Sequence, residues 1–142
     1  LYGILKPLDL MSPYRLEMGT KLKNSKGKNL YDFWGSDISE SINQSISTHK
    51  NKTILNLASV EYFSSVKQGS LVGKVVSPIF KDYKNGKYKI ISFFAKKARG
   101  LMTRYLIENR IDSAEGLSDF NYDGYKYSKL ESTDQSPVFL RK

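Results

Sequence analysis

The chain of 142 residues has no cysteine and only one histidine. The missing cysteine excludes disulfides, zinc–thiolate sites and a cysteine nucleophile. His49 lies in a polar, loop-like stretch, so neither a Ser-His-Asp arrangement nor a transition-metal motif can be written. A P-loop and a GxGxxG pattern are also missing. We therefore expect no metal site and no cofactor.

Long apolar runs are missing as well, since no stretch approaches the ~20 apolar residues that a membrane span needs. No signal peptide is visible. A hydrophobic content of 39% and an aromatic content of 13% predict a folded chain, and its length suits one domain, 1–142. The apolar opening run from Leu1 to Leu5 has no polar lead-in, so we expect this domain to be part of a longer protein.

Hydrophobic periodicity and turn residues predict a mixed α/β (α+β) fold, with a central mixed sheet and flanking helices in the order β-α-β-α-ββ-α-α-ββ. The expected strands are 1–5, 53–57, 72–81, 87–94, 125–130 and 138–141. The expected helices are 30–48 with Asn29 as its cap, 59–66, 95–110 and a short one from Ser113 to 119. Asn85-Gly86 predicts a β-hairpin between the strands 72–81 and 87–94.

Positive charge is concentrated in one part of the chain. Residues 81–110 hold nine Lys and Arg against two acidic residues, Asp82 and Glu108, so a net +7 of the chain's +9 lies there. Charge gathered on one structural unit is typical of proteins that bind a polyanion. The ten tyrosines also suit nucleic acid, because aromatic rings stack on bases.

Helical geometry sorts residues 95–110 into two faces. The expected core-facing residues are Ala98, Leu101, Met102, Tyr105, Leu106 and Asn109. The other face carries Lys96, Lys97, Arg99, Arg104 and Arg110, with Gly100, Thr103 and Ile107 between them. Because Gly100 and Thr103 are small, this face has a low centre along which a nucleic-acid backbone could lie. The alternative is a solvated helix face with a packing glycine. Lys87 and Lys89 on the preceding strand extend the predicted DNA-binding set.

Two further segments could carry chemistry. The proline-stiffened loop 6–19 embeds Asp9, Arg15 and Glu17 among apolar residues, either as a structural Arg–carboxylate pair or as part of a ligand site. Asn56 to Tyr62 runs from a strand into a helix N-terminus, a place where backbone N–H groups bind anions; plain helix capping by Ser59 is the alternative. The candidate anion ligands are Asn56, Ser59, Lys6 and Arg15.

Four blocks of this sequence resemble the YaaA family of bacterial peroxide stress proteins. They are residues 1–19 (LYGILKPLDLMSPYRLEMG), 31–35 (YDFWG), 56–63 (NLASVEYF) and 91–110 (ISFFAKKARGLM continuing to ENR). They follow one another in the family's order nearly from end to end. Family members are longer, and this chain resembles their C-terminal part.

The resemblance implies a cytoplasmic protein of the response to hydrogen peroxide, one that limits free intracellular iron and binds DNA through a basic cleft. The cleft carries over to Lys96, Lys97, Arg99 and Arg104. A helix-hairpin-helix element is attributed to the family, but Arg110-Ile111-Asp112-Ser113 lacks the glycine pair that usually presents backbone N–H groups to phosphate.

Three hypotheses remain open at this point. The first is a DNA-binding stress protein that contacts the backbone and prefers shape or distorted duplex to sequence. The second is an enzyme acting on nucleic acid or a nucleotide-like substrate, with Asp9, Arg15, Glu17 and Glu61 as candidate catalytic groups beside Asn56 and Ser59. The third and least favoured is direct iron binding by carboxylates.

Overall fold

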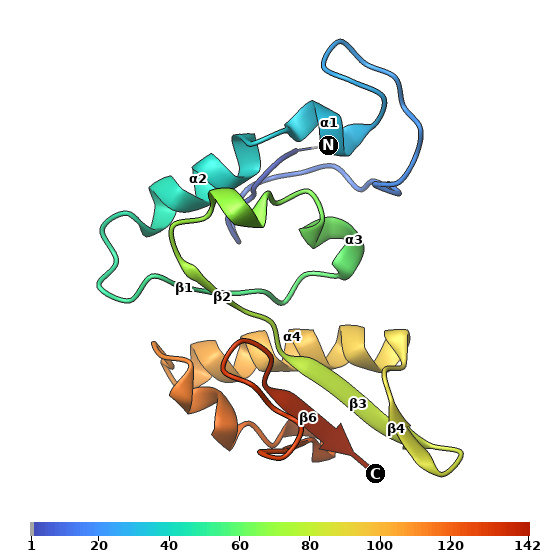
Figure 1. Ribbon diagram of the computed structural model, residues 1–142, viewed down its shortest axis with the longest axis vertical. Helices are drawn as coiled ribbons and strands as arrows, with labels where there is room; N and C mark the ends of the chain where they lie inside the picture. Colours follow the sequence, from blue (N-terminus) through green and yellow to red (C-terminus); the bar gives the residue numbers. More distant parts are fainter. Residues whose placement is uncertain (1) are drawn as a thin grey trace. The chain divides into compact units, whose positions relative to one another are not determined.

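The computed structural model describes residues 2–142, which divide into two compact units (Figure 1). The first unit contains the chain up to His49 together with Ser59–Val72, and the second contains Lys50–Ala58 and Gly73–Lys142. The expectation of a single domain stays a prediction. Leu1 lies outside the described residues, and residues 2–5 form no strand, contrary to the expectation.

The first unit is built from short helices and a long irregular N-terminal segment. Its helices are α1 (Leu30–Trp34), α2 (Asp37–Ile46) and α3 (Val60–Phe63), followed by the 3₁₀ turn η1 (Gln68–Ser70). Asn29 caps α1 as predicted, because its side chain accepts a hydrogen bond from the backbone N–H of Asp32. The predicted helix 30–48 is wrong as one element. Gly35 adopts a φ of 50° and ends α1 before α2 begins.

The second unit holds two sheets. In the smaller, β1 (Thr53–Leu55) pairs in parallel with β2 (Lys74–Val76). The larger has the strand order β4-β3-β6-β5. Its strands are β3 (Ile79–Lys84), β4 (Lys87–Lys89), β5 (Lys126–Tyr127) and β6 (Val138–Arg141). Strands β3 and β6 are parallel, and the other two pairs are antiparallel. The mixed α/β class is confirmed, but one central sheet is replaced by two.

Two strand predictions fail for identifiable reasons. The run 72–81 is split at Ser77-Pro78, and its two halves enter different sheets; proline has no N–H to give to a ladder. The run 87–94 ends as a strand at Lys89, since Ser92 to Phe94 already belong to a helix. The hairpin between β3 and β4 is confirmed, with Asn85 and Gly86 at φ 55° and 81°, as a type I′ turn requires.

Helix α4 (Ser92–Glu108) packs on one face of the larger sheet (Figure 1). Its buried residues, Ala95, Ala98, Met102 and Tyr105, join a core cluster with Phe80 and Phe139 of the sheet. The apolar face predicted for this helix is therefore confirmed, except that Asn109 is exposed. The 3₁₀ turns η2 (Glu115–Asp119) and η3 (Tyr122–Gly124) follow. Ser113 does not cap η2, because Ala114 takes that position.

Candidate nucleic-acid interface

The basic face of α4 is open to solvent, as the periodicity of its sequence requires. Lys96, Lys97 and Arg104 are exposed, and Arg99 is half-buried. A Cβ built on Gly100 meets no atom within 4 Å, so no packing inside the described chain requires glycine at this position. The Thr103 hydroxyl donates to the carbonyl of Arg99, 3.1 Å away, and so stays folded against the helix. The face has the low centre predicted from the sequence.

Two of the predicted cations are not free. Lys97 forms an ion pair with Asp123 at 3.2 Å, and Arg104 forms one with Glu108 at 2.7 Å. The hydrogen bond from Arg104 holds the pKa of Glu108 below its usual value, and Tyr122 adds a second hydrogen bond to that carboxylate. The Lys97 and Arg104 side chains remain 56% and 69% exposed. Surface pairs contribute about 0–1 kcal/mol, so a phosphate can compete for either cation.

Lys97 is linked to a partly buried polar network that no sequence pattern indicated. Arg141 donates from Nε to Asp82 Oδ1 at 2.6 Å and also pairs with Asp123. The Tyr125 hydroxyl donates to Asp82 Oδ2 at 3.0 Å. Burial, followed by the contact with the Asp82 carboxylate, raises the pKa of Tyr125. Asp123 therefore joins the half-buried Arg141 to the exposed Lys97, and the network orients the lysine.

The guanidinium of Arg141 is also held between two aromatic rings. Its central carbon lies 4.7 Å from the ring centre of Phe94 and 4.6 Å from that of Tyr125, distances typical of cation–π contacts. The residues come from α4, β6 and the segment before β5. No local spacing rule joins positions that far apart, so only the strand register, which pairs Asp82 with Arg141, reveals the network.

Arg110 lies beyond the end of α4, so its place on the predicted helical face does not apply. It has a φ of 51°. The N–H of Arg110 donates to the carbonyl of Ile107 at 3.3 Å, and the N–H of Ile111 donates to that of Leu106 at 3.0 Å. These two bonds form a Schellman cap, whose left-handed position glycine usually occupies. Because both N–H groups are used by the helix, neither is available to phosphate in the manner of a helix-hairpin-helix turn.

The two predicted hairpin lysines share the sheet face on which α4 packs. Lys89 pairs in register with Asp82, and Lys87 with Lys84. Since alternate residues of a strand point to opposite faces, both lysines lie on the side of Asp82 and Phe80. Lys87 is exposed and Lys89 is half-buried. Both lysines therefore belong to the same side of the second unit as the basic helix.

The N-terminal loop is fastened to α3 inside the first unit. The N–H of Met18 donates to Glu61 Oε1 at 2.7 Å, and the Tyr62 hydroxyl donates to the carbonyl of Leu16 at 3.1 Å. Asp9 Oδ2 accepts from the N–H of Lys6 at 2.7 Å. The structure thus gives Asp9 and Glu61 structural partners within the loop and α3.

The Arg–carboxylate pair considered for this loop does not form. Arg15 and Glu17 are exposed, and among the described residues neither takes part in an ion pair. The predicted anion ligands at the strand–helix junction fall into different units: Asn56 into the second and Ser59 into the first. The side-chain amide of Asn56 donates a hydrogen bond to Ser77 Oγ at 3.1 Å, and Ser59 caps α3. The enzyme hypothesis stays an untested prediction.

Residues 2–142 hold no group of three or more His, Asp or Glu side chains placed to bind a metal ion. Within the same residues, none of the helices is long and apolar enough to cross a bilayer.

Comparison with known proteins identifies the family. The family described as "Peroxide stress protein YaaA" matches residues 1–131. A UPF0246 protein of Aliivibrio fischeri is 58% identical over 142 residues, and one of Shewanella sediminis is 56% identical over the same length. The chain is covered completely in both cases but spans only 55% of each relative. The chain therefore belongs to the peroxide stress protein YaaA family.

Proposed function

We propose that this part of the protein binds the sugar-phosphate backbone of DNA through the outward face of α4, and that such binding serves protection against peroxide. The observation that carries the proposal is the solvent-facing row of Lys96, Lys97, Arg99 and Arg104 around the open position at Gly100. Lys/Arg contacts with phosphates release counterions and give affinity without sequence preference. Limitation of free iron belongs to the same proposal as an indirect effect.

Local backbone choices in α4 and in its C-terminal cap support a role for this face. Glycine inside a helix costs about 1 kcal/mol relative to alanine, and Gly100 has no packing reason to be there. Arginine in a left-handed position is also unfavourable, yet Arg110 stands where a Schellman cap favours glycine. Departures from local preference gather at functional sites. Close approach of a backbone to Gly100 and a charge at position 110 would account for both.

The decisive experiment reverses two cations that form no ion pair among the described residues, Lys96→Glu with Arg99→Glu. We expect duplex and bubble DNA to bind at least about tenfold more weakly, because two phosphate contacts become repulsive. The slope of log affinity against log salt should become shallower by about 2. Fluorescence anisotropy over a salt series measures both quantities.

The matched control is Lys52→Glu with Lys129→Glu, which makes the same change in net charge at exposed positions outside α4. It should lose much less affinity. Equal losses in the two double variants would show that only total charge matters, and a flat salt response of the unaltered protein would contradict phosphate binding.

Gly100→Ala tests close approach directly. Without a ligand, we expect the free energy of unfolding to rise by about 1 kcal/mol, because alanine is the better helix former and the new methyl group meets nothing. If DNA lies against this position, its affinity should fall even though the protein is more stable. Urea unfolding and anisotropy measure the two effects. A more stable variant with unchanged affinity would place the DNA elsewhere.

A further inference from the structure

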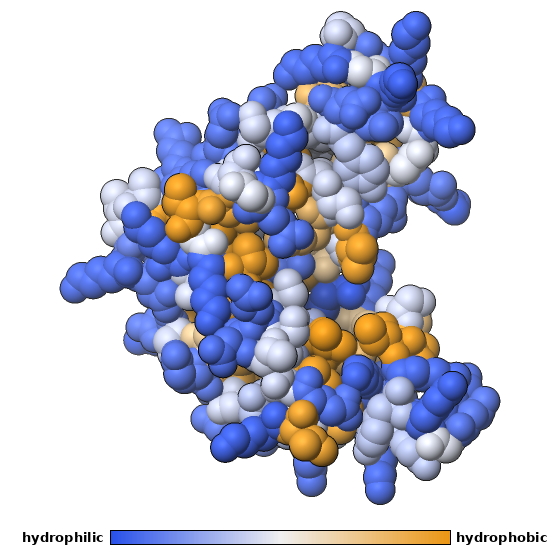
Figure 2. Space-filling view, in the orientation of Figure 1, coloured by the Kyte–Doolittle hydropathy of each residue, from blue (hydrophilic) through white to orange (hydrophobic). Residues whose placement is uncertain are grey.

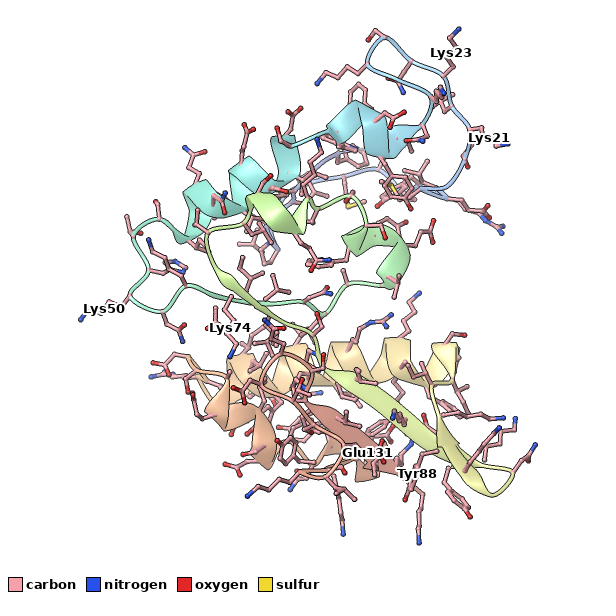
Figure 3. The ribbon with its side chains drawn as sticks, viewed as in Figure 1. Lys21, Lys23, Lys50, Lys74, Tyr88 and Glu131 are labelled. Carbon is pink, nitrogen blue, oxygen red and sulfur yellow. The ribbon has the colours of Figure 1, made fainter. Side chains whose placement is uncertain are left out.

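The face of the larger sheet opposite α4 is a second surface. Strand alternation places Phe80, Asp82, Phe139 and Arg141 toward α4, so Lys81, Tyr83 and Leu140 point away from it. Register then adds Tyr88, opposite Tyr83, and Lys126, opposite Leu140. In the view of Figure 3, Tyr88 and Glu131 both lie away from α4.

Two tyrosines form an aromatic platform on this face. The rings of Tyr83 and Tyr88 meet edge to face with their centres 5.2 Å apart. Tyr83 is 48% exposed, a large value for an aromatic residue in a strand, while Tyr88 is half-buried. In the part of the chain that the structure describes, no hydrogen bond involves either hydroxyl. The Tyr88 ring packs against that of Tyr83, about half of which is still exposed to solvent.

A groove begins beside the platform. It has a volume of about 450 Å³, and its lining includes Tyr88, Lys126, Leu140 and Lys142. Such a volume lies within the range of about 300–1,000 Å³ typical of small-ligand sites. Its two lysines are exposed and form no ion pair among residues 2–142. Apolar and aromatic surface with cations at the rim suits a flat ring attached to an anionic backbone.

Cations outnumber anions among the side chains named on this face. Lys126 and Lys142 are exposed, whereas Lys81 pairs with Glu131 at 2.6 Å. Asp82 points to the opposite face, where Arg141 neutralises it. An acidic peptide would satisfy the lysines but leave the tyrosine ring without a flat partner, whereas unpaired nucleotides satisfy both.

We propose that this sheet face binds single-stranded nucleic acid, with a base stacked on Tyr83, a neighbouring base in the groove beside Tyr88 and phosphates near Lys126 and Lys142. The proposal goes beyond duplex binding by α4, because it concerns unpaired bases and a different surface. Base–aromatic stacking tolerates every base, so the site has no strong sequence preference.

The test compares Tyr83→Ala with Tyr83→Phe, which keeps the ring and removes only the hydroxyl. The probes are a single-stranded oligothymidylate, an oligouridylate and an abasic oligonucleotide of the same length. We expect Tyr83→Ala to bind the base-bearing probes at least about fivefold more weakly, since stacking on one ring gives at least that factor. Tyr83→Phe should stay within about twofold of the unaltered protein.

The abasic probe separates stacking from charge. It should bind the unaltered protein weakly and should be insensitive to Tyr83→Ala. Loss on oligothymidylate, oligouridylate or both supports the site and tells which sugar it accepts. Equal binding of abasic and base-bearing probes, or full affinity of Tyr83→Ala, would overturn it. The duplex affinity of Lys96→Glu with Arg99→Glu tests the α4 surface, and the single-strand affinity of the Tyr83 variants tests the sheet face. A negative result for one surface therefore leaves the other unaffected.

Discussion

Arg141→Ala should destabilise the second unit by about 3–5 kcal/mol, because it leaves a buried carboxylate without its partner. The side chain of Asp82 is only 7% exposed, and Arg141 supplies its charged hydrogen bond at 2.6 Å. The substitution also removes the cation that lies between the rings of Phe94 and Tyr125. Urea unfolding followed by near-ultraviolet circular dichroism of the buried tyrosines and phenylalanines measures the loss.

Two companion variants make the Arg141 result interpretable. Lys142→Ala changes an exposed neighbour and should shift the free energy of unfolding by less than about 0.5 kcal/mol. Asp82→Asn together with Arg141→Met removes both charges and leaves Tyr125 an acceptor. This double variant should be less destabilised than Arg141→Ala alone. A double variant that is destabilised as much as Arg141→Ala would mean that the two residues are not energetically coupled, contrary to the hydrogen bond between them.

Phe139→Ala should also cost about 3–5 kcal/mol, the usual loss for a large aromatic residue in a core. Phe139 is fully buried on the central strand β6. It stacks on Phe80 with ring centres 5.4 Å apart and meets the edge of Phe120 at 5.5 Å. Urea unfolding measures the loss.

Phe93→Ala is the matched control, because it makes the same chemical change at a position that is 73% exposed. Figure 2 shows apolar side chains at the surface of the second unit. We expect Phe93→Ala to change the free energy of unfolding by less than about 0.5 kcal/mol. Comparable losses at both positions would mean that the Phe93 ring is covered.

Local signals predicted the parts of the fold that local forces decide. The Asn85-Gly86 turn, the Asn29 cap and the apolar face of α4 follow from short-range rules, and all three are present. The boundaries that failed depend on more than pattern. The apolar run through Pro78 predicts one strand, but its two halves pair with strands of different sheets.

The candidate site also has a part that local spacing predicts and a part that it does not. Helical spacing was enough to gather Lys96, Lys97 and Arg104 on one face and to place Gly100 between them. The i, i+4 spacing of Arg104 and Glu108 also permits their ion pair. Spacing could not reveal that Asp123 pairs with Lys97, nor that Asp82, Tyr125 and Arg141 meet, because these contacts join distant parts of the chain.

The parallel pairing of β3 with β6 also bears on how the second unit folds. Ile79 lies beside Val138, and the hairpin, α4 and both 3₁₀ turns are strung between them along the chain. Pairing positions that are so distant in sequence requires a large loop to close, and its entropic cost arises before the strand contacts stabilise the chain. This slows folding. Until β6 arrives, β3 has one bare edge, and such an edge can recruit another chain. Newly made protein should therefore be most prone to aggregate in the interval between completion of the hairpin and capture of its last central strand.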